Sequence, residues 1–412
     1  MRQTDIYKIL ILVLCIFLIT GCADRSYPGE EILSAGINRP VNGKYPILPS
    51  IGKLELTDDP SARATSSELK KKLWDNIYIY SYLKDASTDY SLTSSSPKDI
   101  CIVDGLMQDE SSNHGKRSVL SDNEPYITWT NTPMTVYFPD NDKAYNLFAY
   151  YLDGASTSEN SVSKRPEGID IGVTIDGNND VMCAKAEITD EQLSNFSFSE
   201  TDKTNLINMS FSNITASRDI QPVIRFKHKL SKFVFFLFPA REDVGDVYIE
   251  SISVKSKRYG TLTVATSNDD DMVADFSHES EKVDLWLCES DRTTLIKDKY
   301  HPIIEGVDFS KPVYERPYTQ VGGALILPPG EKEYLFELVL KQKKNDVFVY
   351  NRYSMPLQAT QDDELFLAGN QYNVKLAVYG ISDIRPQITI TPWLFGGSVT
   401  LDPEKEFENK FN

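Results

Sequence analysis

The sequence has few of the residues that build reaction centres. Its 412 residues include four histidines and five cysteines, and neither His-Glu-x-x-His nor Cys-x-x-Cys occurs. A zinc-protease helix, a structural zinc site and thioredoxin-like chemistry therefore have no support. The Gly-x-Ser-x-Gly nucleophile motif, the phosphate-binding loop and the dinucleotide motif Gly-x-Gly-x-x-Gly are also missing. We interpret the protein as not an enzyme, and we expect no catalytic residue, no metal site and no cofactor.

Basic residues are scarce relative to acidic ones. Lys and Arg number 43 against 60 Asp and Glu, which gives a net charge of −17 and argues against nucleic acid as a partner. With so many acids, a pair of carboxylates drawn from distant strands, as in glycosidases, stays open as an alternative. The acidic clusters at 140–142 and 268–271 lack the spacing of a calcium-binding EF-hand, so we interpret them as solvated turns.

Long apolar runs are missing except at the N-terminus. Arg2 and Lys8 precede an apolar run of 11 residues, Ile9 to Ile19, which has the length of a signal-peptide core and is too short to cross a bilayer. The run ends in Leu-Ile-Thr-Gly-Cys, which resembles a bacterial lipobox and predicts removal of residues 1–21 and acylation of Cys22. The alternative is a chance cysteine after an ordinary cleavage site, but the Ala-x-Ala end typical of such sites is missing.

The remaining cysteines give little covalent support. Cys101, Cys183 and Cys288 form an odd set, so at most one disulfide is possible, and we expect buried, inert thiols.

The rest of the chain is dominated by a period of two. Ile169, Ile171, Val173 and Ile175 alternate with polar residues before a Gly-Asn-Asn turn at 177–179, which predicts a half-buried strand entering a hairpin. A second hairpin is predicted around the turn at 343–346. Short helices are expected at 65–74, after a Thr-Ser-Ser-Glu capping box, and at 189–193. Further strands are expected at 77–83, 133–139, 146–152, 223–238, 246–255, 282–288, 324–327 and 372–378.

This pattern favours an all-β fold of sandwiches rather than βαβ units. We divide the chain into a signal peptide (1–21), a tether or leader rich in Pro, Gly and Ser (22–60), an N-terminal β-sandwich domain (61–216) and a C-terminal β-sandwich domain with a short tail (217–412). The stretches 86–99 and 153–168 read as exposed loops. Trp129 and Trp286 lie in apolar strand-like runs, and we expect both in the core.

One strand carries a family resemblance. Val223 to Phe233 resembles the Phe-x-His-x-Leu-Ser-Lys strand of the fimbrillin-like proteins of Bacteroidetes. The segments 369–376 and 388–393 are similar to that family's closing strands, and 127–151 is similar to its first-domain pattern. The resemblance covers about residues 60 to 396. His228 lies in this strand, and we assign it a structural role.

The resemblance implies two transthyretin-like β-sandwich domains in tandem. It implies a lipoprotein anchored in the outer membrane, exposed at the cell surface and built into a fimbria, or pilus, as a subunit or tip adhesin. Its partners would be other fimbrial subunits and an unknown host or bacterial surface ligand. In the family a protease cuts after an arginine and a neighbouring subunit donates a strand to the vacated groove. The matching position here is Arg63–Ala64, and Ile51 to Leu56 is the expected removable strand.

Three points of this interpretation stay open. Arg63 can equally be an exposed linker residue. The chain beyond Trp393 departs from a stalk subunit, because after 396–401 it becomes charged and contains Pro403, so a long donor strand is not obvious. A surface glycan-binding lipoprotein, with its tryptophans as stacking platforms, is the alternative function. The four tryptophans are Trp74, Trp129, Trp286 and Trp393.

Overall fold

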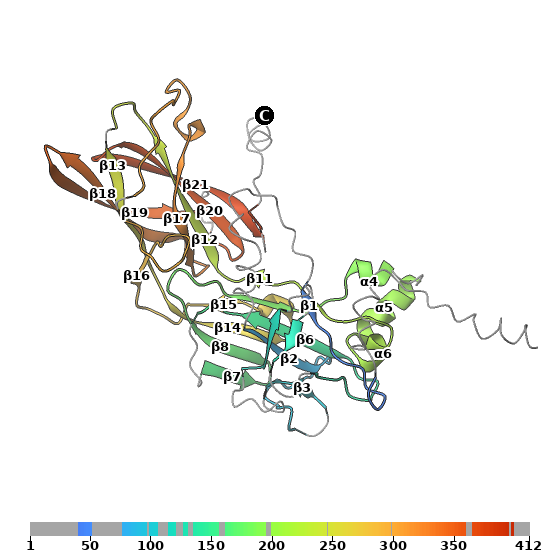
Figure 1. The fold of residues 1–412 in the computed structure, drawn as a ribbon. Coiled ribbons are helices and arrows are strands. Elements are labelled where there is room, and N and C mark those ends of the chain that lie inside the picture. The colour runs from blue at the N-terminus through green and yellow to red at the C-terminus, as the bar shows by residue number, and fades with distance from the viewer. Residues whose placement is uncertain are drawn as a thin grey trace, which may run out of the picture.

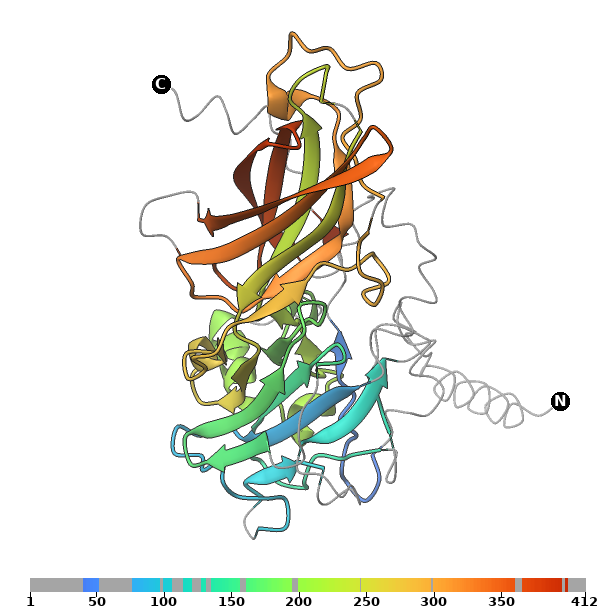
Figure 2. The same ribbon diagram turned by 90° about the vertical axis from the view of Figure 1, so that its left-hand side faces the viewer.

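The computed structural model describes residues 40–51, 76–96, 99–105, 114–120, 127–130, 135–155, 161–194, 199–244, 246–297, 299–359, 365–394 and 397–398. Most regular elements in these ranges are β-strands, and they form two pairs of facing sheets that are stacked end to end (Figures 1 and 2). The expected all-β fold with short helices is confirmed. We refer to the two pairs as the first and the second sandwich.

The first sandwich consists of a central sheet and a cover sheet. The central sheet has the strand order β11-β9-β6-β2-β4-β5, and β3 also pairs with β2. The cover sheet has the order β15-β14-β8-β7. The strands are β2 (Ile77–Leu83), β3 (Cys101–Val103), β4 (Lys116–Leu120), β5 (Ile127–Trp129), β6 (Tyr145–Tyr151), β7 (Val162–Arg165), β8 (Gly168–Thr174), β9 (Met182–Lys185), β11 (Lys227–His228), β14 (Tyr259–Thr266) and β15 (Ala274–Asp275).

The strand predicted from the alternation at 169–175 is present, but its hairpin is not. Ile169, Ile171 and Val173 are buried against the central sheet, as a period of two requires. However, β8 pairs with β7 and β14, and the turn at 177–179 leads instead to β9 in the central sheet. The amide of Ile326 donates to the carbonyl of Gly177 at 2.7 Å, so the second sandwich holds this turn in its crossing position. β7 also lies in a stretch expected as an exposed loop.

The second sandwich consists of sheets with the orders β17-β12-β20-β21-β22 and β16-β13-β18-β19. The hairpin predicted around 343–346 joins β18 to β19, and Asn345 and Asp346 adopt the positive φ values of such a turn. The strands are β12 (Ser231–Pro239), β13 (Val247–Ser256), β16 (Val283–Trp286), β17 (Thr319–Leu327), β18 (Glu333–Lys344), β19 (Val347–Gln358), β20 (Asn370–Gly380), β21 (Asp383–Leu394) and β22 (Gly397–Ser398).

Short helices lie beside the first sandwich. The predicted helix at 189–193 appears as α4 (Asp190–Ser194), and Thr189 and Gln192 cap each other's amides. Two further helices, α5 (Glu200–Met209) and α6 (Asn213–Ala216), are capped by Ser199 and Ser212 and were not predicted. The helix expected at 65–74 lies outside the described residues. The 3₁₀ turns are η4 (Asp269–Asp271) and η5 (Val313–Glu315).

The chain crosses between the sandwiches more often than a tandem order requires. β14 and β15 follow the expected boundary at residue 216, yet β14 pairs along its length with β8, which precedes that boundary. Leu262 and Val264 of β14 are fully buried in the core of the first sandwich. The domain boundary at residue 216 stays a prediction. The pairing of β14 with β8 joins residues from both sides of that boundary.

We expected Trp129, Trp286 and the three cysteines to be buried, and all of them except Trp286 are. The side chain of Trp129 is buried, whereas that of Trp286 is 41 % exposed, so the expectation for Trp286 was wrong. The reason is register, because Leu285 and Leu287 take the inward positions on either side of it. The three cysteines at 101, 183 and 288 are free and buried, as expected. Within the described ranges, no helix is long and apolar enough to span a membrane.

Candidate functional site

Residues 40–51, which we call the leader segment, run along the first sandwich, and residues 45–51 are packed into it while 40–44 are exposed. Ile47 is fully buried and Ile51 nearly so, and both belong to the hydrophobic core on one side of the central sheet. This core also contains Ile77 and Ile79 of β2 and Trp129 of β5. The expectation of a loosely attached leader therefore does not describe these residues. Full burial of one such side chain stabilises a protein by about 1.5–3 kcal/mol.

One edge of the leader segment is bound by the chain around β5. The amide of Ile47 donates to the carbonyl of Val136 at 2.8 Å, and the amide of Phe138 donates to the carbonyl of Tyr45 at 2.9 Å. The indole Nε1 of Trp129 donates to the carbonyl of Ile47 at 3.0 Å. This edge therefore has the hydrogen bonding of a short β-ladder.

The other edge is bound by the chain that follows α5. Ser50 and Ile51 form β1, which pairs in parallel with β10 (Val223–Ile224). The amide group of Gln221 accepts from the amide of Leu48 at 3.1 Å and donates to the carbonyl of Pro46 at 3.1 Å.

Asn213 of α6 binds the backbone of the leader segment in the same way. Its side-chain oxygen accepts from the amide of Tyr45 at 2.7 Å, and its nitrogen donates to the carbonyl of Gly43 at 2.8 Å. Side-chain amides of Asn and Gln thus take the place of a neighbouring strand. Because these hydrogen bonds go to backbone atoms, they recognise an extended segment and not a particular sequence.

Loss of the leader segment would leave an apolar groove with unpaired backbone groups along both edges. A buried donor or acceptor without a partner costs about 1–3 kcal/mol, so binding of another extended segment in the empty groove is strongly favoured. The arrangement is suited to binding a strand. In the part of the chain that the structure describes, no group of three or more His, Cys, Asp and Glu is arranged to hold a metal ion.

The residues predicted to be modified lie outside the described ranges. This applies to Cys22, Arg63 and Ala64, so lipidation and cleavage stay predictions. Of the expected removable strand at 51–56, only Ile51 is described, and it lies in β1. The bound residues 45–51 begin earlier than predicted. Pro46 and Pro49 obscured a weak signal, the apolar spacing of Tyr45, Ile47 and Ile51.

The junction between the sandwiches contains a cluster of ionisable groups. His228 of β11 lies 2.6 Å from Asp180, measured from Nδ1 to Oδ2, and both side chains are almost completely buried. Asp153 accepts from the amide of Asp180 at 3.2 Å and pairs with Arg292, which comes from a loop of the second sandwich. Burial raises the pKa of Asp153, and the Arg292 guanidinium opposes this shift. The ion pair between Asp153 and Arg292 joins the two sandwiches. The structural role of His228 stays a prediction.

Three comparisons place the chain among known proteins. The fimbrillin-like family model matches residues 63–393. Among solved structures, a candidate cell adhesion protein from Bacteroides uniformis has a TM-score of 0.45 and 13 % identity, over 85 % of this chain and 100 % of that chain. One from Bacteroides ovatus has a TM-score of 0.44 and 12 % identity, over 85 % and 97 %. The fimbrial anchor protein Mfa2 from Porphyromonas gingivalis has a TM-score of 0.33 and 9 % identity, over 85 % and 98 %.

No curated protein matches the chain. The family match spans most of the chain and includes residues 223–233 and the closing strands, on which the resemblance was based. The chain belongs to the fimbrillin-like family.

Proposed function

We propose that the protein is a non-enzymatic subunit or tip adhesin of a cell-surface fimbria, and that it joins a neighbouring subunit by strand exchange in the groove of the leader segment. Membership of the fimbrillin-like family supports the fimbrial role and the location at the cell surface. The observation that carries the mode of assembly is that residues 45–51 of the leader segment are packed into the first sandwich and hydrogen-bonded along both edges.

The proposed assembly has three steps: anchoring, cleavage and exchange. The lipid on Cys22 anchors the protein to the outer membrane, and a protease then cuts between Arg63 and Ala64. Residues 40–51 precede that bond, so after cleavage only non-covalent contacts hold them. Two buried isoleucines and the backbone hydrogen bonds keep the segment in place until a competing strand replaces it. The incoming strand regains the same backbone bonds, which makes the exchange close to neutral in hydrogen bonding.

The cleavage step is tested at its expected position. Filaments sheared from cells should contain a form of the protein that begins at Ala64, identified by mass spectrometry. Arg63→Ala should abolish that form and reduce incorporation at least tenfold, whereas Arg241→Ala, which removes an exposed arginine of the second sandwich, should not. If the filaments contain only the intact lipidated chain, the proposed processing is wrong.

The exchange step is tested separately by locking the leader segment. Ser50 and Val223 are paired residues of β1 and β10, and neighbouring strands lie about 4.8 Å apart, within reach of a disulfide. Ser50→Cys with Val223→Cys should allow cleavage but block incorporation under oxidising conditions, and a reductant should restore it. Thr261→Cys with Asp275→Cys, a paired position of β14 and β15, is the matched control. Normal incorporation of the locked variant would exclude exchange in this groove.

A second candidate function, binding of a surface glycan, is favoured by one observation. The indole of Trp286 is exposed on the outer face of β16, where it is available for stacking on a sugar ring. Trp129 is buried and does not serve this purpose. On a glycan array, Trp286→Ala should weaken a bound glycan by about 1–3 kcal/mol, the value of one aromatic stacking platform. Unchanged binding, or none to begin with, removes this candidate.

A further inference from the structure

The hairpin of β18 and β19 carries four successive apolar residues directly after its turn. Between 40 % and 64 % of each side chain is exposed in Val347, Phe348, Val349 and Tyr350. Val347 and Val349 lie on the same face of β19 as the buried Leu357. The tip of the hairpin therefore projects beyond the part of the second sandwich that covers this face (Figures 1 and 2). Apolar side chains exposed together in this way mark an interaction surface.

The backbone of β19 also forms the border of its sheet. In the described part of the chain, β19 pairs with β18 on one side and with no strand on the other. Asn345 and Asp346 form a two-residue turn with positive φ values, so the residues that close it, Lys344 and Val347, exchange hydrogen bonds. Because hydrogen bonding alternates along a strand, the backbone groups of odd-numbered residues face β18. Those of even-numbered residues face the free border.

This border lacks the features that prevent other edge strands from pairing. The edge strands β5, β7, β11, β15, β16 and β22 have two to four residues each. The edge strand β17 has nine residues but carries a bulge around Gly322. By contrast, β19 has 12 residues, and residues 347–351 include no charge, glycine or proline. Only at Pro356, an even-numbered position, does a missing N–H interrupt the free border.

The exposed part of β19 is complementary to itself in antiparallel order. When two copies are aligned with Val349 at the centre, Phe348 of one copy lies opposite Tyr350 of the other. The same alignment brings Asp346 next to Arg352 of the other copy, and these side chains are 92 % and 69 % exposed. Residues 348 and 350 both direct their backbone groups to the free border, so these groups meet across the contact. An alignment centred on Arg352 would instead place two arginines against each other.

We propose that β19 pairs with β19 of a second copy of this chain, antiparallel and centred on Val349, which joins two four-stranded sheets edge to edge. Val349 is close to the turn, so the two chains extend from the contact in opposite directions and their sandwiches do not collide. The contact is small beside the roughly 800 Å² per partner of a stable complex, so free copies associate weakly. Many copies along a filament would add such contacts together. This side-by-side contact is separate from strand exchange.

A disulfide at the centre of the contact tests its register. The protein is the chain without its expected signal peptide and with Cys22→Ser, since the cysteines at 101, 183 and 288 are buried. Val349→Cys places two thiols in a pair whose Cα atoms are about 4.5 Å apart, within reach of a disulfide. Val347→Cys is the matched control on the same face, because the two copies of residue 347 are about 13 Å apart. Oxidation should cross-link Val349→Cys at least tenfold more, and equal yields would overturn the proposal.

Prolines on the free border test the backbone pairing in sedimentation equilibrium. Tyr350→Pro removes an N–H that faces the border and keeps the hydrogen bonds to β18, so it should weaken dimer formation at least tenfold. Tyr350→Ala keeps that N–H and should weaken it less. Ser354→Pro places the same residue in the same row, beyond the proposed pairing, and should have no effect. Equal dimer formation by the two proline variants, or a wild type that stays monomeric at its highest soluble concentration, would overturn the proposal.

The ion pairs at the two ends of the contact are tested by removing one charge. Arg352→Gln should weaken dimer formation about fivefold, and added salt should reduce this difference. Glu337→Gln removes the carboxylate that lies 3.7 Å from Arg352 in the same chain and should leave the dimer unchanged. Equal effects of the two variants would overturn the placement of Asp346 next to Arg352 of the other copy.

Discussion

The two sandwiches are built in different ways from one chain. The first combines the leader segment, the chain from β2 to β11 and the later strands β14 and β15, and its longest strand, β14, has 8 residues. The second is closed by its own strands, of which β18, β19 and β21 have 12 residues each. Long paired strands make the second sandwich self-sufficient, whereas the first is completed by segments from elsewhere. A unit completed in this way is the one suited to exchanging a segment.

The largest effect on stability is expected for a substitution in the core of the second sandwich. Phe235 is fully buried and stacks on Phe336 across the two sheets. Phe235→Ala should lower the free energy of unfolding by about 3–5 kcal/mol through loss of burial and formation of a cavity. In hydrogen exchange, β18 and β20 should lose protection and β6 should keep it. Equal loss in β6 would show that the sandwiches unfold as one unit.

A similar substitution tests whether the first sandwich depends on a later segment. Leu262 of β14 is fully buried among Ile169 and Ile171 of β8. Leu262→Ala should cost about 2–5 kcal/mol and expose the amides of β8 to exchange, although residue 262 lies beyond the expected boundary. Tyr259→Ala, at an exposed position of the same strand, should change stability by less than about 0.5 kcal/mol. Loss of protection confined to β13 and β18 would contradict the assignment of β14 to the first sandwich.

A smaller effect is expected where the leader segment meets β5. Trp129→Phe removes the donor to the carbonyl of Ile47 and should cost about 1–2 kcal/mol. Because the lost bond holds the leader segment, proteolysis at 40–51 should accelerate while the second sandwich stays resistant. Trp286→Phe is the matched control, since that indole is exposed. Unchanged proteolysis would mean that this hydrogen bond does not hold the leader segment.

The smallest effect concerns the junction between the sandwiches and its dependence on pH. The pKa of Asp153 is raised by burial, so between its ordinary value and its raised value the folded state binds more protons than the unfolded state. The free energy of unfolding should therefore fall as the pH rises through this window, and Asp153→Asn should remove that slope. Denaturant unfolding at a series of pH values measures this slope.

For Asp291, which lies next to Arg292, the stability should depend on pH in the opposite direction. Hydrogen bonds from Thr294, and from the amide of Thr293, lower its pKa to about 2. Its contribution is present above the ordinary value of 3.8 and is lost as the pH falls towards 2. Asp291→Asn should therefore lower the stability at neutral pH, and its difference from the wild type should disappear as the pH falls towards 2. An identical pH profile for the two variants would contradict both assignments.

Several strands, turns and helices could be predicted because residues close together in the sequence specify them. The alternation of Tyr334, Phe336 and Leu338 places them on one face of β18, and the Asn345–Asp346 turn fixes the hairpin that follows. The capping residues Thr189 and Gln192 predicted α4 for the same reason. The helix α5 was missed although Ser199 caps it, because its ten residues bury only Leu206 and so show no apolar period.

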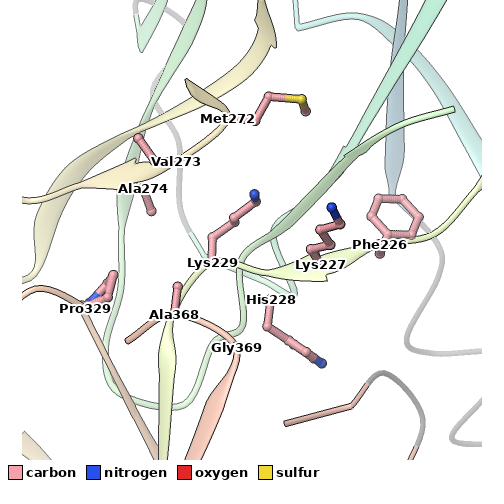
Figure 3. A pocket seen from close by; sticks show the side chains of 10 residues that line it. All are labelled: Phe226, Lys227, His228, Lys229, Met272, Val273, Ala274, Pro329, Ala368 and Gly369. Carbon is pink, nitrogen blue, oxygen red and sulfur yellow. The ribbon is translucent and has the colours of Figure 1, made fainter. Parts of the chain in front are cut away.

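The candidate site was predicted only in outline. The sequence indicated a removable segment before Arg63, but the groove required contacts such as that between Leu48 and Gln221, which are 173 positions apart. No local pattern shows that the two atoms of one side-chain amide will pair with a distant backbone. Likewise, the cavity of about 570 Å³ at the junction is lined by residues that are distant in sequence, such as Phe226, Met272 and Pro329 (Figure 3).

The sequence alone therefore determined the all-β fold and most of its strands, since a period of two in polarity reflects which face of each strand avoids water. It also carried the family resemblance. The tertiary structure decided which strands are neighbours: β8 joins β14 rather than β9, Trp286 faces outward, and the leader segment lies inside the first sandwich. The physical reason is that an apolar face specifies only that it must be covered, and packing of the whole chain selects what covers it.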